Sequence, residues 1–184
     1  MVVCNPFNAD SVMYSHKCLM PVEGHLQLGG GEDIIFDLNN SQLIIDDHKG
    51  YYPYVTTYDW VTGLGQTSEG ILIGFNLTNN QVIKQEKYNE NCLWLNGQLH
   101  PLPPISITRP DGYKGIWTIV DKYDMVNLQF TPVVHTSVNL NYLVICSKYE
   151  GPYGYYSGYL RKASGEKVMI DKMFVMGEDF YLRT

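Results

Sequence analysis

Short segments of alternating apolar and polar residues, separated by turn-forming residues, recur along the chain from Cys18 to its end. Side chains of a β-strand alternate between its two faces, so this period of two is typical of strands with one buried face. No stretch shows the spacing of three and four that an amphipathic helix requires. We therefore expect an all-β fold with little or no helix, in which an antiparallel meander closes into a β-barrel. The predicted strands are Cys18–Leu28, Asp33–Leu38, Tyr52–Thr62, Glu69–Thr78, Cys92–Leu95, Leu99–Leu102, Ile105–Arg109, Ile116–Asp121, Val126–Thr131, Asn141–Tyr149, Tyr153–Lys162 and Lys167–Asp171.

Turn signals join several of these strands. Asn96-Gly97 predicts a type I′ hairpin turn, which needs residues that tolerate positive φ, and Ser164-Gly165 predicts a second tight hairpin. The triplet Gly29–Gly31 is interpreted as a turn, because a phosphate-binding loop would be expected to open a helix. Pro101–Pro104 predicts a loop or an edge crossing.

The segment Tyr51–Trp60 carries an aromatic stripe. On an extended chain, one face would present Tyr52, Tyr54, Thr56, Tyr58 and Trp60. Rings with hydroxyl tips suit a cavity that holds a partly polar organic molecule at least as well as a dry core.

A second stripe occupies the odd positions of the predicted strand Tyr153–Lys162, including Tyr155, Tyr159 and Arg161. The rings could line a cavity or make cross-strand packing pairs, and both alternatives stay open. Arg161 could bind a carboxylate or phosphate of a ligand, but an ordinary surface ion pair is the simpler interpretation.

Three groups of polar residues could carry chemistry. The run Asp46–Lys49 could bind a metal or supply a general base, although a solvated turn explains it as well. Glu90 and Asn91, together with His100, could transfer protons at a cavity mouth; capping and loop hydrogen bonds are the alternative. Asn76 interrupts an apolar strand and needs a hydrogen-bond partner.

Composition narrows the class of protein. With 184 residues we expect one domain, residues 16–184, preceded by an N-terminal extension, residues 1–15. A net charge of −6 without a basic run disfavours nucleic acid as a partner. The sequence shows no secretory signal and no apolar membrane span, so we expect a cytoplasmic protein. Four widely spaced cysteines without a CxxC pair predict free thiols, and no motif indicates a metal or another cofactor.

Several blocks taken together carry a family resemblance. They are HKCLMPVEGHLQLGG, IDDHKGYYPYVTTYDW, ILIGFNLT, ENCLWLNGQLH, LQFTP and VMIDKMFVMGEDF. In their order and spacing, from about His16 onward, the chain resembles the C-terminal half of an uncharacterised bacterial family, domain of unknown function 2804. The matching positions include Asp46, Gly50, Pro53, Tyr54, Trp60, Gly74, Asn76, Glu90, Asn91, Gly97 and His100. Asp47 and His48 depart from the family pattern, which puts in doubt a shared role for that segment.

The resemblance has implications for fold and partners. Members are similar to lipocalin-like β-barrels and distantly to carotenoid hydratases and tocopherol cyclases, which implies a large apolar cavity. They are typically longer than this chain, so the resemblance also implies a homo-oligomer or a partner chain that replaces the missing N-terminal half.

Three functions follow as hypotheses. The first is binding of a hydrophobic or amphipathic small molecule in the barrel. Its candidate ligand-binding residues are Tyr52, Tyr54, Tyr58, Trp60, Asn76, Glu90, Asn91, His100, Tyr155, Tyr159 and Arg161. The second is a hydratase- or cyclase-like reaction on an isoprenoid or lipid, with Asp46, Glu90 or His100 as weak catalytic candidates and an acid that protonates a double bond. The third is a structural or interaction module whose aromatic strands fill a core.

Overall fold

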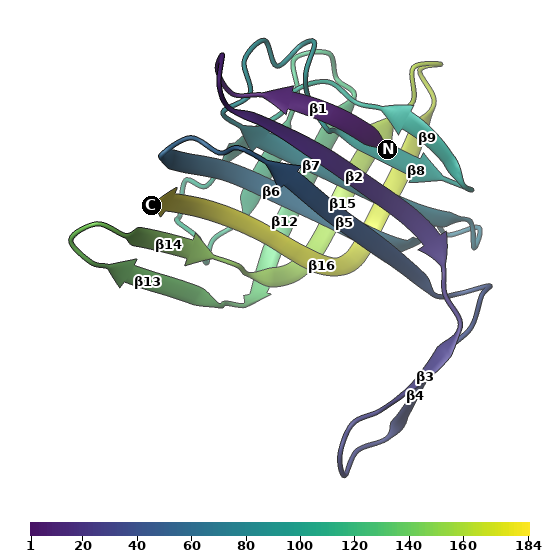
Figure 1. Cartoon of the computed structure of the whole chain (residues 1–184). Helices are drawn as coiled ribbons and strands as arrows, with labels where there is room; N and C mark the ends of the chain where they lie inside the picture. Colours follow the sequence, from purple (N-terminus) through teal and green to yellow (C-terminus); the bar gives the residue numbers. More distant parts are fainter.

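The computed structural model describes the whole chain, Met1–Thr184, and contains sixteen β-strands and no helix (Figure 1). Every strand pair is antiparallel. The prediction of an antiparallel all-β fold is therefore confirmed. The structure contains no helix with the length and apolar character that crossing a membrane requires.

Most strands belong to one sheet of eleven strands. Nine of them follow the order β10-β11-β12-β15-β16-β6-β7-β8-β9, and β13 and β14 join through β16. The bounds are β6 (Val55–Gln66), β7 (Leu72–Asn80), β8 (Cys92–Leu95), β9 (Gln98–Pro101), β10 (Ser106–Thr108), β11 (Trp117–Val120), β12 (Val126–Val134), β13 (Ser137–Asn141), β14 (Cys146–Glu150), β15 (Tyr153–Arg161) and β16 (Lys167–Arg183).

Two smaller sheets complete the fold. The strands β1 (Val2–Pro6), β2 (Val12–Pro21) and β5 (Gln42–Gly50) form a three-stranded sheet that lies across the large one (Figure 1). The strands β3 (Gly24–Gln27) and β4 (Asp33–Phe36) form a hairpin that projects away from both sheets.

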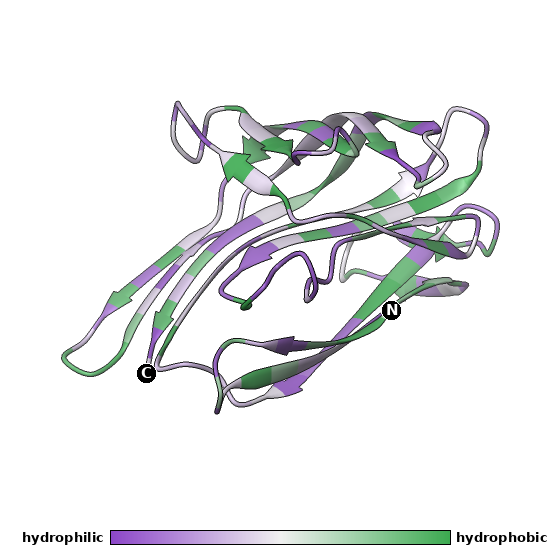
Figure 2. Cartoon of the chain, turned by 90° about the horizontal axis from the view of Figure 1, so that it is seen from above, coloured by the Kyte–Doolittle hydropathy of each residue, from purple (hydrophilic) through white to green (hydrophobic).

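The large sheet curls over itself, as Figure 2 shows from above. Its two end strands, β9 and β10, do not pair with each other, so the sheet forms a half-barrel. The curvature agrees with the predicted barrel, but the expected complete closure is absent.

The inner face of the half-barrel is filled with side chains. Rings of Phe75, Trp117, Phe130 and Tyr156 contact one another there, with Phe130 and Tyr156 stacked at 4.5 Å between centroids. These rings belong to a continuous cluster of seventeen buried residues. The inner face is therefore a hydrophobic core of the kind that stabilises a β-sandwich.

The outer face of β6 and β7 packs against the three-stranded sheet. Gly74 on β7 marks the close approach of the two layers, since a Cβ there would lie 2.8 Å from a methyl group of Leu19 on β2. Gln42 on β5 donates a hydrogen bond to the carbonyl oxygen of Gly65 at 2.7 Å. The molecule thus has two interfaces, one on each face of β6 and β7.

The N-terminal strands differ from the prediction. The expected strand Cys18–Leu28 is divided between the end of β2 and the hairpin strand β3. Residues 1–15 form β1 and the first part of β2, so the expected domain boundary at residue 16 lies inside a strand. The run Asp46–Lys49, interpreted as a solvated turn, belongs to β5. The polar composition of this segment did not indicate a strand. The composition is polar because only one face of β5 is covered by the rest of the protein.

Three further predicted strands differ from the structure. The predicted strand Asn141–Tyr149 spans the turn between β13 and β14, where Tyr142 N–H donates to the Ile145 carbonyl oxygen. The strand predicted to begin at Tyr52 begins at Val55, after Pro53, which has no N–H to donate to a sheet. The strand predicted to end at Asp171 continues to Arg183. Lys172 adopts a positive φ of 48° at an irregularity of the strand, and this irregularity interrupts the alternation from which the strand was predicted.

The predicted turns are confirmed. Asn96 and Gly97 both have positive φ, as a type I′ turn requires, and they connect β8 to β9. Gly165 lies in the turn between β15 and β16 with a φ of 89°. The triplet Gly29–Gly31 lies in the turn of the β3–β4 hairpin.

Candidate functional site

A cavity of about 280 Å³ lies between the large sheet and the three-stranded sheet. Odd-numbered residues of β6 and β7, such as Val61 and Phe75, fill the core, so the even-numbered residues project toward β2 and β5. The apolar and aromatic lining residues are Phe7, Met13, Tyr52, Tyr58 and Trp60. The polar lining residues are Lys17, Asp46, His48, Thr56, Thr57, Thr78, Asn80, Glu90 and Glu178.

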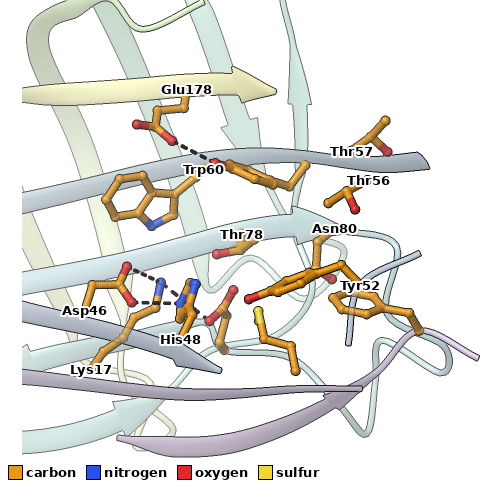
Figure 3. A pocket seen from close by; sticks show the side chains of 14 residues that line it. Lys17, Asp46, His48, Tyr52, Thr56, Thr57, Trp60, Thr78, Asn80 and Glu178 are labelled. Carbon is orange, nitrogen blue, oxygen red and sulfur yellow. Dashed lines mark hydrogen bonds and ion pairs between the residues drawn. The ribbon is translucent and has the colours of Figure 1, made fainter. Parts of the chain in front are cut away.

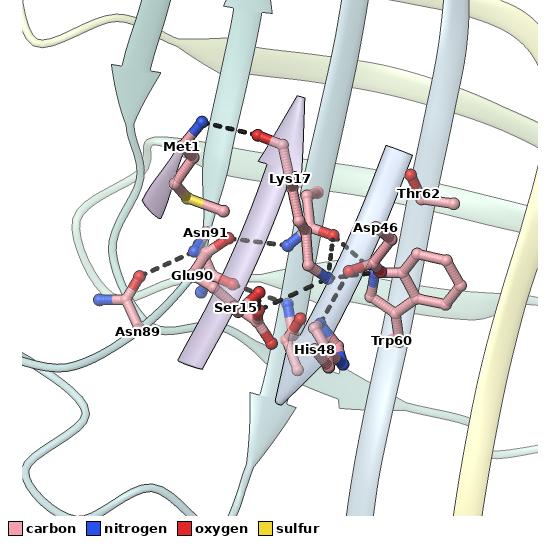
Figure 4. A network of polar contacts seen from close by, with 12 residues as sticks. Met1, Ser15, Lys17, Asp46, His48, Trp60, Thr62, Asn89, Glu90 and Asn91 are labelled. Carbon is pink, nitrogen blue, oxygen red and sulfur yellow. Dashed lines mark hydrogen bonds and ion pairs between the residues drawn. The ribbon is translucent and has the colours of Figure 1, made fainter. Parts of the chain in front are cut away.

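Lys17 is the centre of a buried polar network (Figure 4). The residue is only 1% exposed, and its Nζ lies 3.0 Å from Asp46 Oδ2 and 3.5 Å from Glu90 Oε2. The ammonium also donates a hydrogen bond to Asn76 Oδ1 at 3.0 Å. A buried cation requires such partners, because an unpaired charge in a dry interior is strongly unfavourable.

Asn76 and Glu90 extend this network across the two layers. Asn76 accepts a hydrogen bond from Trp60 Nε1 at 2.7 Å and donates one to the carbonyl oxygen of Glu90 at 2.7 Å. Ser15 Oγ on β2 donates to Glu90 Oε2 at 2.9 Å. Asn76 therefore has the partners that its place in an apolar strand demands.

Asp46 and His48 face the cavity together because they are two residues apart on β5. His48 Nε2 lies 2.7 Å from Asp46 Oδ1, and the opposite carboxylate oxygen contacts Lys17. Burial alone would raise the pKa of Asp46, but the hydrogen bond with His48 and the charge of Lys17 outweigh it and lower that pKa. Asp46 is therefore held in its ionised form.

Glu178 on β16 lies on the opposite wall, beside Trp60 (Figure 3). Its carboxylate accepts hydrogen bonds from Tyr149 at 2.9 Å and from Tyr58 at 3.3 Å. It makes no ion pair. Burial raises the pKa of Glu178, although the two phenol hydroxyls act in the opposite direction. Burial, followed by the charge of Glu178, likewise raises the pKa of Tyr58, so this phenol remains protonated.

Thr78 on β7 also lines the cavity. Its Oγ1 is buried without a hydrogen-bond partner, whereas its backbone N–H donates to Asn91 Oδ1 at 2.6 Å. Asn91 also donates to the carbonyl oxygen of Pro103 at 2.8 Å. Asn91 thus supports the chain behind the cavity, and the Thr78 hydroxyl is left without a partner beside it.

The structure brings about half of the sequence-predicted residues together. Tyr52, Tyr58, Trp60, Glu90 and the weak catalytic candidate Asp46 line the cavity, and Asn76 lies directly behind Trp60. Tyr54, before β6, is 64% exposed and is not part of the lining. His100 pairs with Leu93 across the β8–β9 hairpin and is also outside the lining.

The stripe on β15 faces away from this cavity. Tyr155 is exposed, and Tyr159 donates a hydrogen bond to Asp124 on the protein surface. Arg161 contacts the carboxylate of Asp124 at 2.5 Å, which is the surface ion pair considered as the simpler alternative. Alternation is correct on this strand, but its buried ring is Tyr156, at an even position in the filled core.

Sequence reasoning missed Ser15, Lys17, Thr78 and Glu178. A signal was present for Ser15 and Lys17, since they are two residues apart on β2 and share a face with the apolar Met13. Glu178 likewise shares a face with Met176 and Phe180, but the predicted strand ended before it. Charged residues on a strand face are ordinarily assigned to solvent. For this reason Lys17 and Glu178, which lie on opposite walls of the cavity, were not predicted.

The polar residues of the cavity are suited to bind a ligand through hydrogen bonds and charge. The structure contains no group of three or more His, Cys, Asp or Glu side chains placed to hold a metal ion. All four cysteines are free, and burial raises the pKa of Cys92 to about 12, so that thiol is unreactive. The cavity therefore combines an ionic wall, an aromatic wall and a carboxylate, Glu178, that accepts two hydrogen bonds but makes no ion pair.

Comparison with known proteins gave one match. A family model described as Domain of unknown function (DUF2804) matches residues 1–183, in agreement with the resemblance seen in the sequence. Neither the search of curated proteins nor the search of solved structures found a match.

Proposed function

The chain belongs to the DUF2804 family, which is defined without an activity, and we therefore propose a function from its site. We propose that the protein binds a small amphipathic organic molecule in the cavity between β6–β7 and β2–β5. The observation that carries this proposal is the composition of the lining, in which aromatic rings and an ordered ionic network share one space of about 280 Å³. Small-molecule sites typically combine apolar walls with a few placed polar groups.

The energetics are compatible with useful affinity. Burial of one large apolar side chain against a ligand contributes on the order of 1.5–3 kcal/mol. Contacts with Tyr52, Tyr58 and Trp60 could therefore support roughly micromolar binding after the entropic cost of association. The network around Lys17 favours such binding, because it fixes the polar wall before a ligand arrives.

The proposal places the ligand outside the barrel interior. The interior is filled by the rings of Trp117, Phe130 and Tyr156, as the structural-module hypothesis expected of a core. That hypothesis accounts for the inner face of β6 and β7. It does not account for a cavity on their outer face that is lined by a carboxylate without an ion pair.

An enzyme that protonates a double bond is supported less well. Such a reaction needs a carboxylic acid that stays neutral, and the lowered pKa of Asp46 has the opposite sign. Glu90, the other proposed acid, is held by Ser15 and Lys17. The expectations of a cytoplasmic location and of a second chain as partner stay predictions.

Tryptophan fluorescence tests the binding proposal. The chain has three tryptophans, and only Trp60 lines the cavity. Titration with octanol, octylammonium and octanoate should change the emission of the protein, with at least one dissociation constant in the micromolar range. Trp60→Phe should abolish the response, whereas the control Trp94→Phe should retain it. Calorimetry that detects no heat of binding for any of the three compounds would contradict the proposal.

A further inference from the structure

Glu178 is a carboxylate with no cationic partner in the aromatic part of the cavity. We propose that the cavity selects an organic cation, so that the polar end of the ligand is an ammonium group that lies beside Glu178 and Trp60. This inference rests on the proposed binding function and adds the chemical class of the ligand.

The charges of the lining favour a cation. Three carboxylates, Asp46, Glu90 and Glu178, face the cavity with a single lysine. Two negative charges are therefore unbalanced when His48 is neutral. Opposite charges that meet in a partly buried site attract each other more strongly than in water, which favours a positively charged ligand.

Lys17 is not free to bind an anion. Its side chain is 2% exposed and its ammonium contacts Asp46, Glu90 and Asn76. An ammonium has three donors, and these three partners use them. A fatty acid or a phosphate would thus meet carboxylates and rings in this cavity, with no available basic group except His48.

The geometry forms a row of suitable groups across three strands. Glu178 on β16 is directly opposite Trp60 on β6, and Trp60 is directly opposite Thr78 on β7. Neighbouring strands are about 4.8 Å apart, so the indole lies between the carboxylate and the hydroxyl. A ring face attracts cations, and the Lys17 ammonium already lies 5.1 Å from the centroid of the Trp60 ring. The ligand ammonium is therefore placed at Glu178, which has no ion-pair partner.

Thr78 provides independent support for a polar ligand. The residue is 8% exposed, lines the cavity, and leaves its Oγ1 without a partner. Buried hydroxyls are nearly always hydrogen-bonded, so an unused one in a cavity wall indicates where a ligand group belongs.

A matched set of probes tests the sign of the charge. Octylammonium, octanol and octanoate carry one apolar chain with a positive, neutral or negative head. Calorimetry at neutral pH should show octylammonium binding about tenfold more tightly than octanol, which corresponds to about 1.4 kcal/mol, and octanoate binding more weakly than octanol.

Two variants locate the effect. Glu178→Gln should reduce the preference for octylammonium over octanol to less than about twofold, because the charge is removed while the shape is kept. Glu69→Gln makes the same substitution at an exposed turn without an ion pair and should retain the full preference.

A pH series separates binding from a structural role. The groups that face Glu178 are Tyr58 from β6 and Tyr149 from β14, with Lys17 from β2 and Asp46 from β5 at longer range. A bound cation favours ionised Glu178, so the affinity for octylammonium should fall as the pH is lowered and protons compete. The affinity for octanol should change less.

Glu178→Gln should raise the stability of the protein at neutral pH, although it weakens the binding of octylammonium. A carboxyl group whose pKa is raised on folding favours the native state at low pH, and this contribution is lost as the pH rises through the folded pKa. At neutral pH the variant should therefore unfold at a higher urea concentration than the parent. A residue that only supported the fold would instead destabilise the protein on substitution.

The outcomes distinguish this inference from the function on which it rests. If octanoate binds as tightly as octylammonium, or if Glu178→Gln leaves the preference intact, the cation is excluded and the binding site stands. If none of the three probes binds, both proposals fail. If the parent protein binds octylammonium more tightly than octanol and octanoate, and Glu178→Gln removes this difference, both proposals are supported.

Discussion

Lys17 illustrates at the scale of one residue how a polar interior holds two sheets together. Its ammonium lies between carboxylates from β5 and from the loop before β8, so its loss leaves Asp46 and Glu90 facing each other. Lys17→Met should lower the free energy of unfolding by about 3 kcal/mol, since removing one partner of a buried ion pair strands the other. Urea unfolding followed by fluorescence measures the change.

Lys49 offers the matched control for that substitution. Lys49 lies on β5, on the exposed face opposite to the face that carries Asp46 and His48, and it makes no ion pair. Lys49→Met should change the unfolding free energy by less than about 0.5 kcal/mol. Equal losses in the two variants would mean that the network around Lys17 contributes little.

The residues of the site were predictable where chemistry and alternation agree. Tyr58 and Trp60 were identified because aromatic residues two apart on a strand share a face. Asp46 and Glu90 stood out as acidic residues beside apolar segments. Lys17 and Glu178 were missed because a charged residue gives the same local pattern whether its face meets solvent or a second polar layer.

At the scale of the element, β5 shows why local pattern is insufficient. Its two faces carry Asp46 and His48 toward the cavity and Asp47 and Lys49 toward solvent, so both faces are polar. The strand exists because it pairs with nine consecutive residues of β2. Pairing between distant segments leaves no signature in the composition of either, and the segment was therefore interpreted as a turn.

The β3–β4 hairpin is an element that the site does not require. It projects from the end of the β2–β5 pair, where Val22 N–H still donates to the Ser41 carbonyl oxygen at 3.1 Å (Figure 1). Replacing residues 23–40 by Asn-Gly should close this pair with a type I′ turn. We expect the unfolding free energy to change by less than about 1 kcal/mol, because an isolated hairpin contributes little stability of its own.

Binding provides the second measurement on the shortened protein. Its fluorescence response to octylammonium should equal that of the full chain, since no residue of the hairpin lines the cavity. Between the deleted residues and the large sheet, the deletion removes one exposed hydrogen bond, from Gln66 to the carbonyl oxygen of Asn39. Loss of the response with the fold retained would show that the hairpin takes part in the site.

At the scale of the whole molecule, alternation was sufficient for the class of fold and insufficient for the location of the cavity. A period of two identifies two faces of β6 and β7 but not which layer covers each face. The expected ligand space inside the barrel is filled by Phe130, Tyr156 and their neighbours. The cavity is instead on the other face, because the three-stranded sheet that covers it presents polar residues such as Ser15 and Lys17.

Self-association, expected from the family resemblance, belongs to this largest scale and stays a prediction. The turn between β13 and β14 exposes Tyr142–Ile145, and Leu143 at its tip is 96% exposed. Exposed apolar clusters of this kind commonly mark contact surfaces. Light scattering at tens of micromolar should detect a species larger than one chain, and the double variant Leu143→Ser, Val144→Ser should shift it toward the monomer. Ile35→Ser, at a 76% exposed position on β4, removes a similar side chain elsewhere and should leave the distribution unchanged. A parent protein that is strictly monomeric at this concentration would exclude the association.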